Sequence, residues 1–387
     1  MSLISAENAM AVMAALFVIA GLGFVGEKTR VGAHLTGAVI AIVTAIAAAN
    51  LNIIPHSSPA YDFVFSYFVP VLIPLFLFKA DLKRLFFETT RTTMAFLLAS
   101  VGTVAGVTLA ALCLDLGSLA SQAPLAIAER EAAVAGLFAS TYIGGSVNYA
   151  ALGEVTGLSQ DASFFSAATA ADNLFSAVYL GLLALLPGWR WLAQKYPAHD
   201  YSAGSVEVEH SEGISAMSLV LALAAAMVIV VAADAAVAYL GGSGWRYMVI
   251  TALSLAVATL APGLVKHMIG SFELGVGLSL VFFAAIAAGA DVVAMVQVAP
   301  LLISLVLILL SVHFLVTFTV GRWLGLSMPE LIIASNAAIL GATTAPALAA
   351  AKGWNNLITP GILVGVFGYA LGTFVGTIIF KFWVFIL

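Results

Sequence analysis

The sequence predicts an all-α polytopic membrane protein with about twelve transmembrane segments. Of its 387 residues, 63% are hydrophobic and only 9% are Asp, Glu, Lys or Arg, whereas charged residues make up about 25% of an ordinary soluble domain. So few charges cannot cover the surface of a soluble protein of this size. The apolar runs are continuous and mostly reach the roughly 20 residues that a spanning helix needs. They therefore predict helices, and not the alternating strands of a membrane β-barrel.

The longest polar stretch of the chain separates the expected spans into two sets of six. We therefore divide the chain into a first repeat (1–187), a polar linker (188–214) and a second repeat (215–387). The spans expected in the first repeat are 7–26, 32–50, 61–80, 92–115, 132–153 and 162–187. Those expected in the second repeat are 215–240, 246–264, 271–290, 298–325, 330–351 and 357–387.

The two repeats resemble each other, and their charges indicate inverted topology. The third span of each repeat ends at an acid, Asp81 or Asp291, and a shift of 197 positions places Gly144 on Gly341. With simple alternation of spans, Lys and Arg favour one side by 6 to 1 in the first repeat, and the other side by 5 to 2 in the second. Inverted repeats that both obey the positive-inside rule show this reversal. Two contiguous six-span repeats cannot be inverted, so we expect eleven to thirteen crossings.

Composition and motifs exclude several classes of function. One cysteine, Cys113, excludes a disulfide scaffold, and a net charge of -5 without a basic stripe predicts no nucleic-acid partner. The sequence has no HExxH, P-loop or GxSxG motif, and no histidine pair has the spacing of transition-metal ligands. We therefore expect neither an enzyme nor a cofactor, and any uphill transport must draw on an ion gradient.

The fifth span of each repeat carries a polar, glycine-containing interruption at mid-membrane depth. One is TYIGGSVN, from Thr141 to Asn148, and the other is GATTAP, from Gly341 to Pro346. Glycine and proline weaken a helix, and matched interruptions in two repeats indicate a transporter binding site. The alternative is a packing interface of small residues. The residues expected to bind substrate are Thr141, Tyr142, Gly144, Gly145, Ser146, Gly341, Ala342, Thr343, Thr344 and Asn336.

Asp172 is an acid in the middle of the sixth span, where a charge is costly and marks a functional site by default. Hydroxyl and amide side chains lie near it along the helix, and hard oxygen ligands of this kind suit an alkali cation, or a proton if the carboxylate titrates. The alternative is a buried aspartate that binds a helix terminus. The residues expected to bind a cation, with Na⁺ as the coupling ion, are Asn148, Ser166, Thr169, Asp172, Asn173 and Thr344.

His313 lies at the centre of another expected span. It is interpreted either as a proton carrier or substrate contact, or as a histidine with hydrogen bonds between helices. Asp234 is interpreted as a structural or interfacial carboxylate. Asp81 and Asp291 are interpreted as interfacial, although their matched positions also fit a gating role.

Four segments together resemble the DUF819 family of bacterial and plastid membrane proteins. They are IPLFLFKADLKRL from Ile73, TYIGGSVNYAA from Thr141, ADNLFSAVY from Ala171 and GATTAPALAAAKGW from Gly341. The resemblance implies membership of the superfamily of cation/proton antiporters and anion transporters, which includes bile-acid sodium symporters. It implies two crossed broken helices, elevator-type alternating access and a scaffold beside a mobile core (spans within 92–187 and 298–387). It also implies a homodimer and, in a bacterium, the inner membrane.

The expected function is therefore secondary transport, with Na⁺-coupled symport of a small organic anion such as an organic acid, amino acid or short peptide. Antiporters of the superfamily often carry an acidic pair where this chain has Asp172 and Asn173. This difference favours Na⁺-coupled symport over electrogenic proton antiport. The alternatives are a cation/proton antiporter, and a channel or an assembly protein. Lipid is an expected partner in every case.

Overall fold

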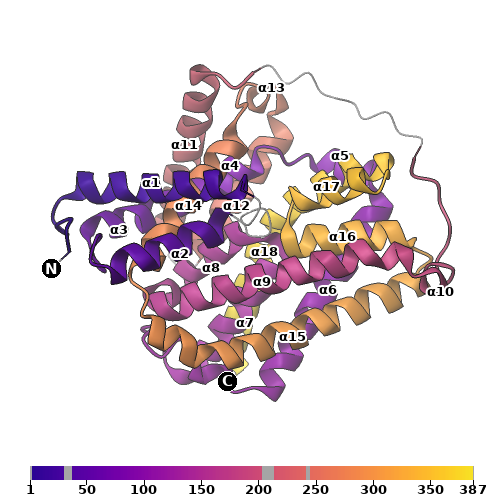
Figure 1. Cartoon of the computed structure of the whole chain (residues 1–387). Coiled ribbons are helices and arrows are strands. Elements are labelled where there is room, and N and C mark those ends of the chain that lie inside the picture. The colour runs from indigo at the N-terminus through magenta and orange to yellow at the C-terminus, as the bar shows by residue number, and fades with distance from the viewer. Residues whose placement is uncertain (1, 30–36, 203–212, 241–244, 387) are drawn as a thin grey trace.

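The computed structural model describes residues 2–29, 37–202, 213–240 and 245–386, and every regular element within these ranges is a helix (Figure 1). The prediction of an all-α protein is confirmed for this part of the chain. The expected start of the span 32–50 and positions 203–212 of the polar linker lie outside the described residues.

The helices follow the expected spans closely. In the first repeat they are α1 (Ala9–Glu27), α2 (Gly37–Asn50), α3 (Pro59–Phe63), α4 (Val69–Leu77), α5 (Leu82–Phe87), α6 (Thr90–Cys113), α7 (Ile127–Gly144), α8 (Ser146–Thr156) and α9 (Ala162–Leu185), and the polar linker begins with the short helix α10 (Arg190–Ala193). In the second they are α11 (Ala216–Leu240), α12 (Arg246–Leu260), α13 (Pro262–Val265), α14 (Ser271–Ala288), α15 (Val292–Trp323), α16 (Met328–Leu340), α17 (Thr344–Ala351) and α18 (Ile358–Ile386).

Eight segments of the described chain are long and apolar enough to cross a membrane. One of them, Pro59–Leu77, joins α3 and α4 through a π-helical turn, Val64–Phe68. Three further apolar helices, α2, α12 and α16, are shorter. The length criterion excludes α8 and α17, because the predicted interruptions divide the fifth span of each repeat into shorter helices.

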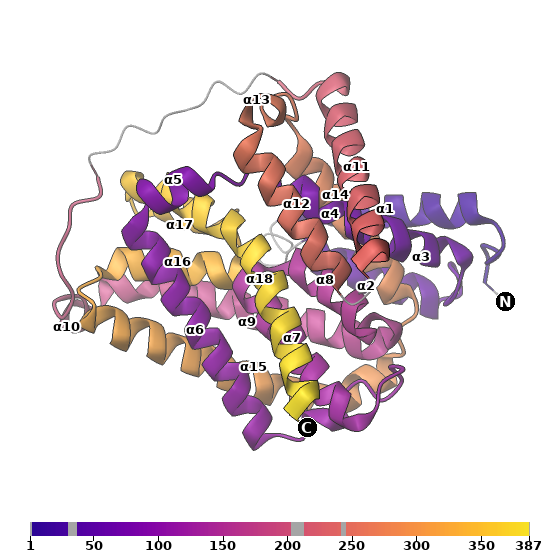
Figure 2. The same ribbon diagram turned by 180° about the vertical axis from the view of Figure 1, so that it is seen from behind.

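The helices pack in two groups. In the first group, α1 packs on α2 and α11 packs on α12. Between these pairs, α4 and α14 lie against each other, with α14 against α1, α2 and α11, and α4 against α11 and α12. In the second group, the most extensive contacts join α7 to α18 and α6 to α15 (Figure 2), and α9 runs beside α15 (Figure 1). Contacts between the groups include those of α14 with α9 and of α4 with α8.

Small residues allow the closest of these helix pairs to approach. A Cβ on Gly106 of α6 would lie 2.9 Å from the Leu309 Cα of α15, and one on Gly136 of α7 would lie 2.7 Å from the Gly376 carbonyl oxygen of α18. A membrane helix gains little by hiding apolar surface from lipid, so close backbone packing of this kind is a main source of helix association there. These contacts hold the second group together around the two interruptions.

Acids at the helix ends have local structural partners. Asp81 and Asp291 each cap the helix that follows, by accepting the backbone N–H of Arg84 or of Val293. Asp234 of α11 accepts two hydrogen bonds from the Arg246 guanidinium at the start of α12. The interpretation of Asp234 as a structural carboxylate is confirmed.

The first part of the polar linker, residues 188–202, is anchored beside α16 at Tyr201. The Tyr201 hydroxyl lies 2.8 Å from Ser327 Oγ, and the Tyr201 carbonyl accepts the Asn356 backbone N–H at 3.1 Å. Burial raises the pKa of Tyr201 to about 12, so this hydroxyl keeps its proton at any physiological pH. The linker therefore docks onto the second group before it continues to the second repeat.

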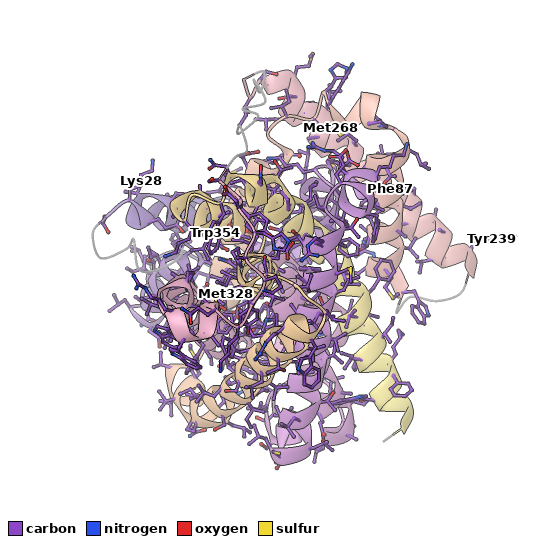
Figure 3. All side chains as sticks on the ribbon, turned by 90° about the vertical axis from the view of Figure 1, so that its right-hand side faces the viewer. Lys28, Phe87, Tyr239, Met268, Met328 and Trp354 are labelled. Atoms are coloured by element: carbon purple, nitrogen blue, oxygen red, sulfur yellow. The ribbon has the colours of Figure 1, made fainter. Side chains whose placement is uncertain are left out.

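Apolar side chains point outward from the outer helices. Tyr239 at the end of α11 is 92% exposed and projects from the edge of the molecule, and Phe87 of α5 is 86% exposed (Figure 3). Met10, Val18 and Val25 of α1 are exposed as well. Such surfaces are expected where lipid replaces water, whereas a soluble monomer rarely shows them.

Candidate functional site

Both predicted interruptions occur, each at a glycine with an unusual backbone conformation. Gly145 separates α7 from α8 with φ 74° and ψ -165°, and Gly341 ends α16 with φ 88° and ψ -168°. Essentially only glycine adopts this region. The shared conformation pairs Gly145 with Gly341, so the alignment of Gly144 with Gly341 is wrong by one residue. Residue texture alone cannot tell which of two adjacent glycines turns the chain.

The two interruptions meet at Tyr369 of α18. Its Cε1 atom lies 3.9 Å from the position of a Cβ on Gly145 and 3.8 Å from that on Gly341, and its hydroxyl is hydrogen-bonded to the Ala342 backbone. On the other side, the rings of Phe76 and Phe272 face it at 5.2 Å and 6.4 Å between centroids. Sequence reasoning missed Tyr369, although it is the single tyrosine of α18.

The first interruption brings together several polar groups that lack partners. Thr141 Oγ1, the Tyr142 hydroxyl and Asn148 Oδ1 are buried without a hydrogen bond of standard geometry. Asn148 Nδ2 donates to the Tyr369 carbonyl at 2.6 Å and to Thr373 Oγ1 at 2.8 Å, which attaches α8 to α18. Gly144 fits tightly between Asn148 and α18, and Ser146 is exposed at the start of α8.

The second interruption repeats this pattern with different residues. Thr344 Oγ1 donates to Asn336 Oδ1 at 2.6 Å, while Asn336 Nδ2 is buried without a partner. Thr343 is exposed at the N-cap of α17, and Ala342 is buried beside Tyr369. Asn336 and Thr344 stand five residues before and three residues after the turning glycine, as Ser140 and Asn148 do at the first interruption.

Asp172 lies next to the first interruption and has no cationic partner. Ser176 Oγ donates to Asp172 Oδ1 at 3.4 Å, and the Tyr142 hydroxyl faces the same carboxylate. Among the described residues, no Lys, Arg or His nitrogen lies within 4.0 Å of it. Ser166 Oγ, one and a half turns earlier on α9, is also buried without a partner. The arrangement offers a carboxylate and hydroxyl oxygens without a positive charge.

Other predicted cation ligands are engaged elsewhere. Thr169 Oγ1 donates to the Phe165 carbonyl at 2.8 Å, and Asn173 Nδ2 donates to the Thr169 carbonyl at 2.8 Å, both within α9. Asn148 and Thr344 share no hydrogen bond with Asp172 in the described part of the chain. Of the described groups, Ser176 and Tyr142 are the ones shown at the Asp172 carboxylate, and cation binding by the other residues stays a prediction.

His313 makes hydrogen bonds between helices through both ring nitrogens. Nδ1 lies 2.9 Å from Thr103 Oγ1 of α6, and Nε2 lies 2.9 Å from Ser335 Oγ of α16, which in turn contacts the Tyr179 hydroxyl at 2.8 Å. The side chain is fully buried. The structure therefore gives His313 the interhelical hydrogen bonds of the second interpretation. A role in carrying protons or contacting substrate stays a prediction.

The described residues hold no group of three or more His, Cys, Asp or Glu side chains that could bind a metal ion. The fold and the site thus define a class: a helical membrane protein with two glycine-broken helices that meet beside an unpaired acid.

The chain belongs to the family described as "Protein of unknown function (DUF819)", whose model matches residues 14–384. It is 31% identical, over 396 aligned residues, to the uncharacterized membrane protein YjcL of Bacillus subtilis (strain 168), and the alignment covers 97% of each chain. The resemblance to DUF819 is confirmed over nearly the whole length.

Proposed function

We propose that this protein is a secondary transporter that couples the movement of Na⁺ to that of a small organic anion. The observation that carries the proposal is the meeting of two glycine-broken helices at Tyr369, next to an acid for which the described part of the chain provides no cationic partner. Broken helices in corresponding positions of two repeats indicate the binding site of a secondary transporter.

The surroundings of Asp172 favour a cation. An ionisable side chain within a span usually pairs with an opposite charge or serves an ion pathway, and no ion pair is found for Asp172 in the described residues. Ser176 and Tyr142 add hydroxyl oxygens, which suit a hard cation such as Na⁺.

The starts of α8 and α17 favour an anion as the second ligand. A helix N-terminus carries a partial positive charge from its unpaired N–H groups. Ser146 and Thr343 are the exposed residues at these two starts, and no Lys or Arg lies in either interruption. A carboxylate of an organic acid, amino acid or short peptide would complement the two helix ends.

Alternating access in this proposal is of the elevator type. The helices within 92–187 and 298–387 form the mobile core, and those within 1–91 and 215–297 form the scaffold, as in the superfamily of cation/proton antiporters and anion transporters. The separate packing of α1, α2, α4, α11, α12 and α14 supports this division. Inverted repeats, a homodimer built through the scaffold and a place in a bacterial inner membrane belong to the same proposal.

The test is a thermal-unfolding screen followed by transport. Purified protein is heated with organic acids, amino acids and short peptides, in Na⁺ and separately in K⁺, because a ligand that binds only the folded state raises its melting temperature. An active compound is then assayed for uptake into proteoliposomes under a Na⁺ gradient.

We expect Asp172→Asn to abolish both the Na⁺-dependent shift and the uptake. Asp234→Asn serves as the control, because Asp234 is paired with Arg246 outside this site. Uptake that survives Asp172→Asn and Asn148→Ala would show that the site is assigned wrongly.

The second candidate is a cation/proton antiporter, which the unpaired Asp172 also favours because one carboxylate can exchange Na⁺ for a proton. This candidate predicts a pH change inside vesicles on addition of Na⁺ alone. Symport predicts none until the organic solute is present.

A further inference from the structure

A cavity of about 430 Å³ opens between the two groups of helices, away from the interruptions. Its walls come from the loop before α3 and the adjoining π-helical turn, from the end of α8, from the start of α9 and from the end of α14. The polar side chains of its lining include Ser57, Asp62, Ser66, Glu154, Ser159 and Gln160.

Asp62 and Glu154 make this lining acidic, and no Lys or Arg is found among its described residues. Glu154 accepts a hydrogen bond from Ser159 Oγ at 2.7 Å, and Asp62 is exposed. Arg246, which lies near Glu154, is outside the lining and is bound by Asp234 through two nitrogens. His56 directs Nδ1 to the Ala288 carbonyl, 2.9 Å away. A recess lined by one sign of charge concentrates ions of the opposite sign.

Aromatic rings lie one helical turn from the lining on both α9 and α14. Phe165 follows Ala162 of the lining by one turn of α9, and Phe282 precedes Ala285 of the lining by one turn of α14. Their centroids are 6.3 Å apart with the rings at 87°, and both are fully buried. Phe65, itself part of the lining, meets Phe282 at 6.0 Å.

Along α9, the polar groups of the candidate site follow Phe165 in the chain. Ser166, with its unpartnered hydroxyl, follows Phe165 in the chain. Asp172 lies seven residues after Phe165 along α9, which is about 10 Å. On α8, the Tyr149 hydroxyl donates to the Phe165 carbonyl at 2.6 Å. Both α8 and α9 thus lead from the cavity, past one aromatic contact, to the first interruption and Asp172.

The two rings of this contact belong to different groups of helices. Phe165 is held against α8, because a Cβ on Gly153 would lie only 2.4 Å from its ring. Phe282 and Phe65 belong to α14 and to the segment between α3 and α4, in the other group. A displacement of one group past the other would therefore separate Phe165 from Phe282 without disturbing either helix.

We propose that this cavity is the aqueous entrance through which cations reach Asp172, and that the contact between Phe165 and Phe282 is its gate. The inference rests on the proposed function only in taking Asp172 as the destination. Asp62 and Glu154 draw cations into the entrance and repel anions, so an organic anion enters from elsewhere.

The preference of the entrance for cations over anions is tested by thiol labelling in proteoliposomes. Cys113 is the single cysteine, so Cys113→Ser yields a background without thiols, into which Ser57→Cys is introduced. Its labelling rates with a cationic and an anionic methanethiosulfonate are each divided by the rate for a free thiol in solution. We expect the cationic reagent to be favoured by about tenfold or more at low salt. Adding Asp62→Asn and Glu154→Gln should abolish the preference. Equal normalised rates, or a preference that survives both substitutions, would overturn the proposal.

The gate is tested with Ser166→Cys in the same background. We expect slow labelling by the cationic reagent when the rings are intact, and labelling at least about tenfold faster in Phe282→Ala. Phe282→Leu, which retains most of the volume, should lie in between, and the melting temperature checks that each variant is folded. A rate that Phe282→Ala leaves unchanged would contradict the gate.

Neither labelling experiment requires transport. A failure of the proposed function, such as uptake that ignores Asp172, would therefore leave these labelling results unaffected and can be told apart from a failure of the entrance.

Discussion

Gly145 and Gly341 share one backbone conformation and face the same ring, although 196 positions separate them in the chain. Tyr369 fills the space between them and bonds to the backbone that follows the second glycine. Two halves with few identical residues thus build the same turn twice at one point. The turn requires the conformational freedom of glycine, so a side chain at either position would be strained although there is space for it.

We expect Gly145→Ala and Gly341→Ala each to destabilise the fold by about 1–3 kcal/mol, because alanine must adopt a region that only glycine reaches easily. Thermal unfolding in detergent measures the loss. Gly181→Ala and Gly277→Ala are the matched controls, because both glycines lie within helices and have open space at Cβ. They should be neutral or stabilising by up to about 1 kcal/mol. Equal effects at all four positions would contradict the assigned conformations.

Asn148→Ala should cost about 1–3 kcal/mol, since it removes both hydrogen bonds that the buried Asn148 amide donates from α8 to α18. The nearby Ser146→Ala should change stability by less than about 0.5 kcal/mol, because Ser146 is exposed. Chemical or thermal unfolding of the two variants in parallel provides the comparison. A larger loss of stability in Ser146→Ala than in Asn148→Ala would contradict the assignment of Asn148 as the link between α8 and α18.

The hydrogen bonds of His313 predict non-additive effects. Thr103 Oγ1 contacts the Tyr142 carbonyl at 3.0 Å and can donate there only if it accepts from His313 Nδ1. Thr103→Val and His313→Phe should therefore each lower stability, with a coupling of about 0.5–3 kcal/mol in the double variant. A double-mutant cycle of melting curves measures the coupling. Strict additivity would show that the two side chains do not act through each other.

The ion pair of Arg91 with Glu330 should matter more than that of Lys79 with Glu273. Arg91 donates to both carboxylate oxygens of Glu330, whose side chain is only 3% exposed. Arg91→Ala would leave this buried carboxylate without its positive partner, which should lower the free energy of unfolding by up to about 3–5 kcal/mol. Both partners of the Lys79 pair are about half exposed, and Lys79→Ala should cost less than about 1 kcal/mol. The two melting temperatures decide the order, and a reversed order would be incompatible with these contacts.

Much of the candidate site was visible in the sequence because glycine and charge are rare signals in an apolar span. The interruptions at Gly145 and Gly341 and the isolated Asp172 followed from composition and spacing. The sequence did not predict the register between the two interruptions, because only the backbone conformation shows whether Gly144 or Gly145 corresponds to Gly341. Tyr369 was not predicted as a site residue, and Tyr142 was predicted to bind substrate but not to face Asp172. Both contacts join different helices, so the sequence alone could not reveal them.

By itself, the sequence determined that this protein is a helical membrane protein with two broken helices, because lipid forces each span to satisfy its own backbone hydrogen bonds. Only the tertiary structure decided which polar groups share a site. Asn173, next in the chain to Asp172, bonds back to its own helix, whereas Tyr142 from another helix faces the carboxylate. A helix directs successive side chains to different neighbours, so proximity along the chain does not bring two groups to one ligand.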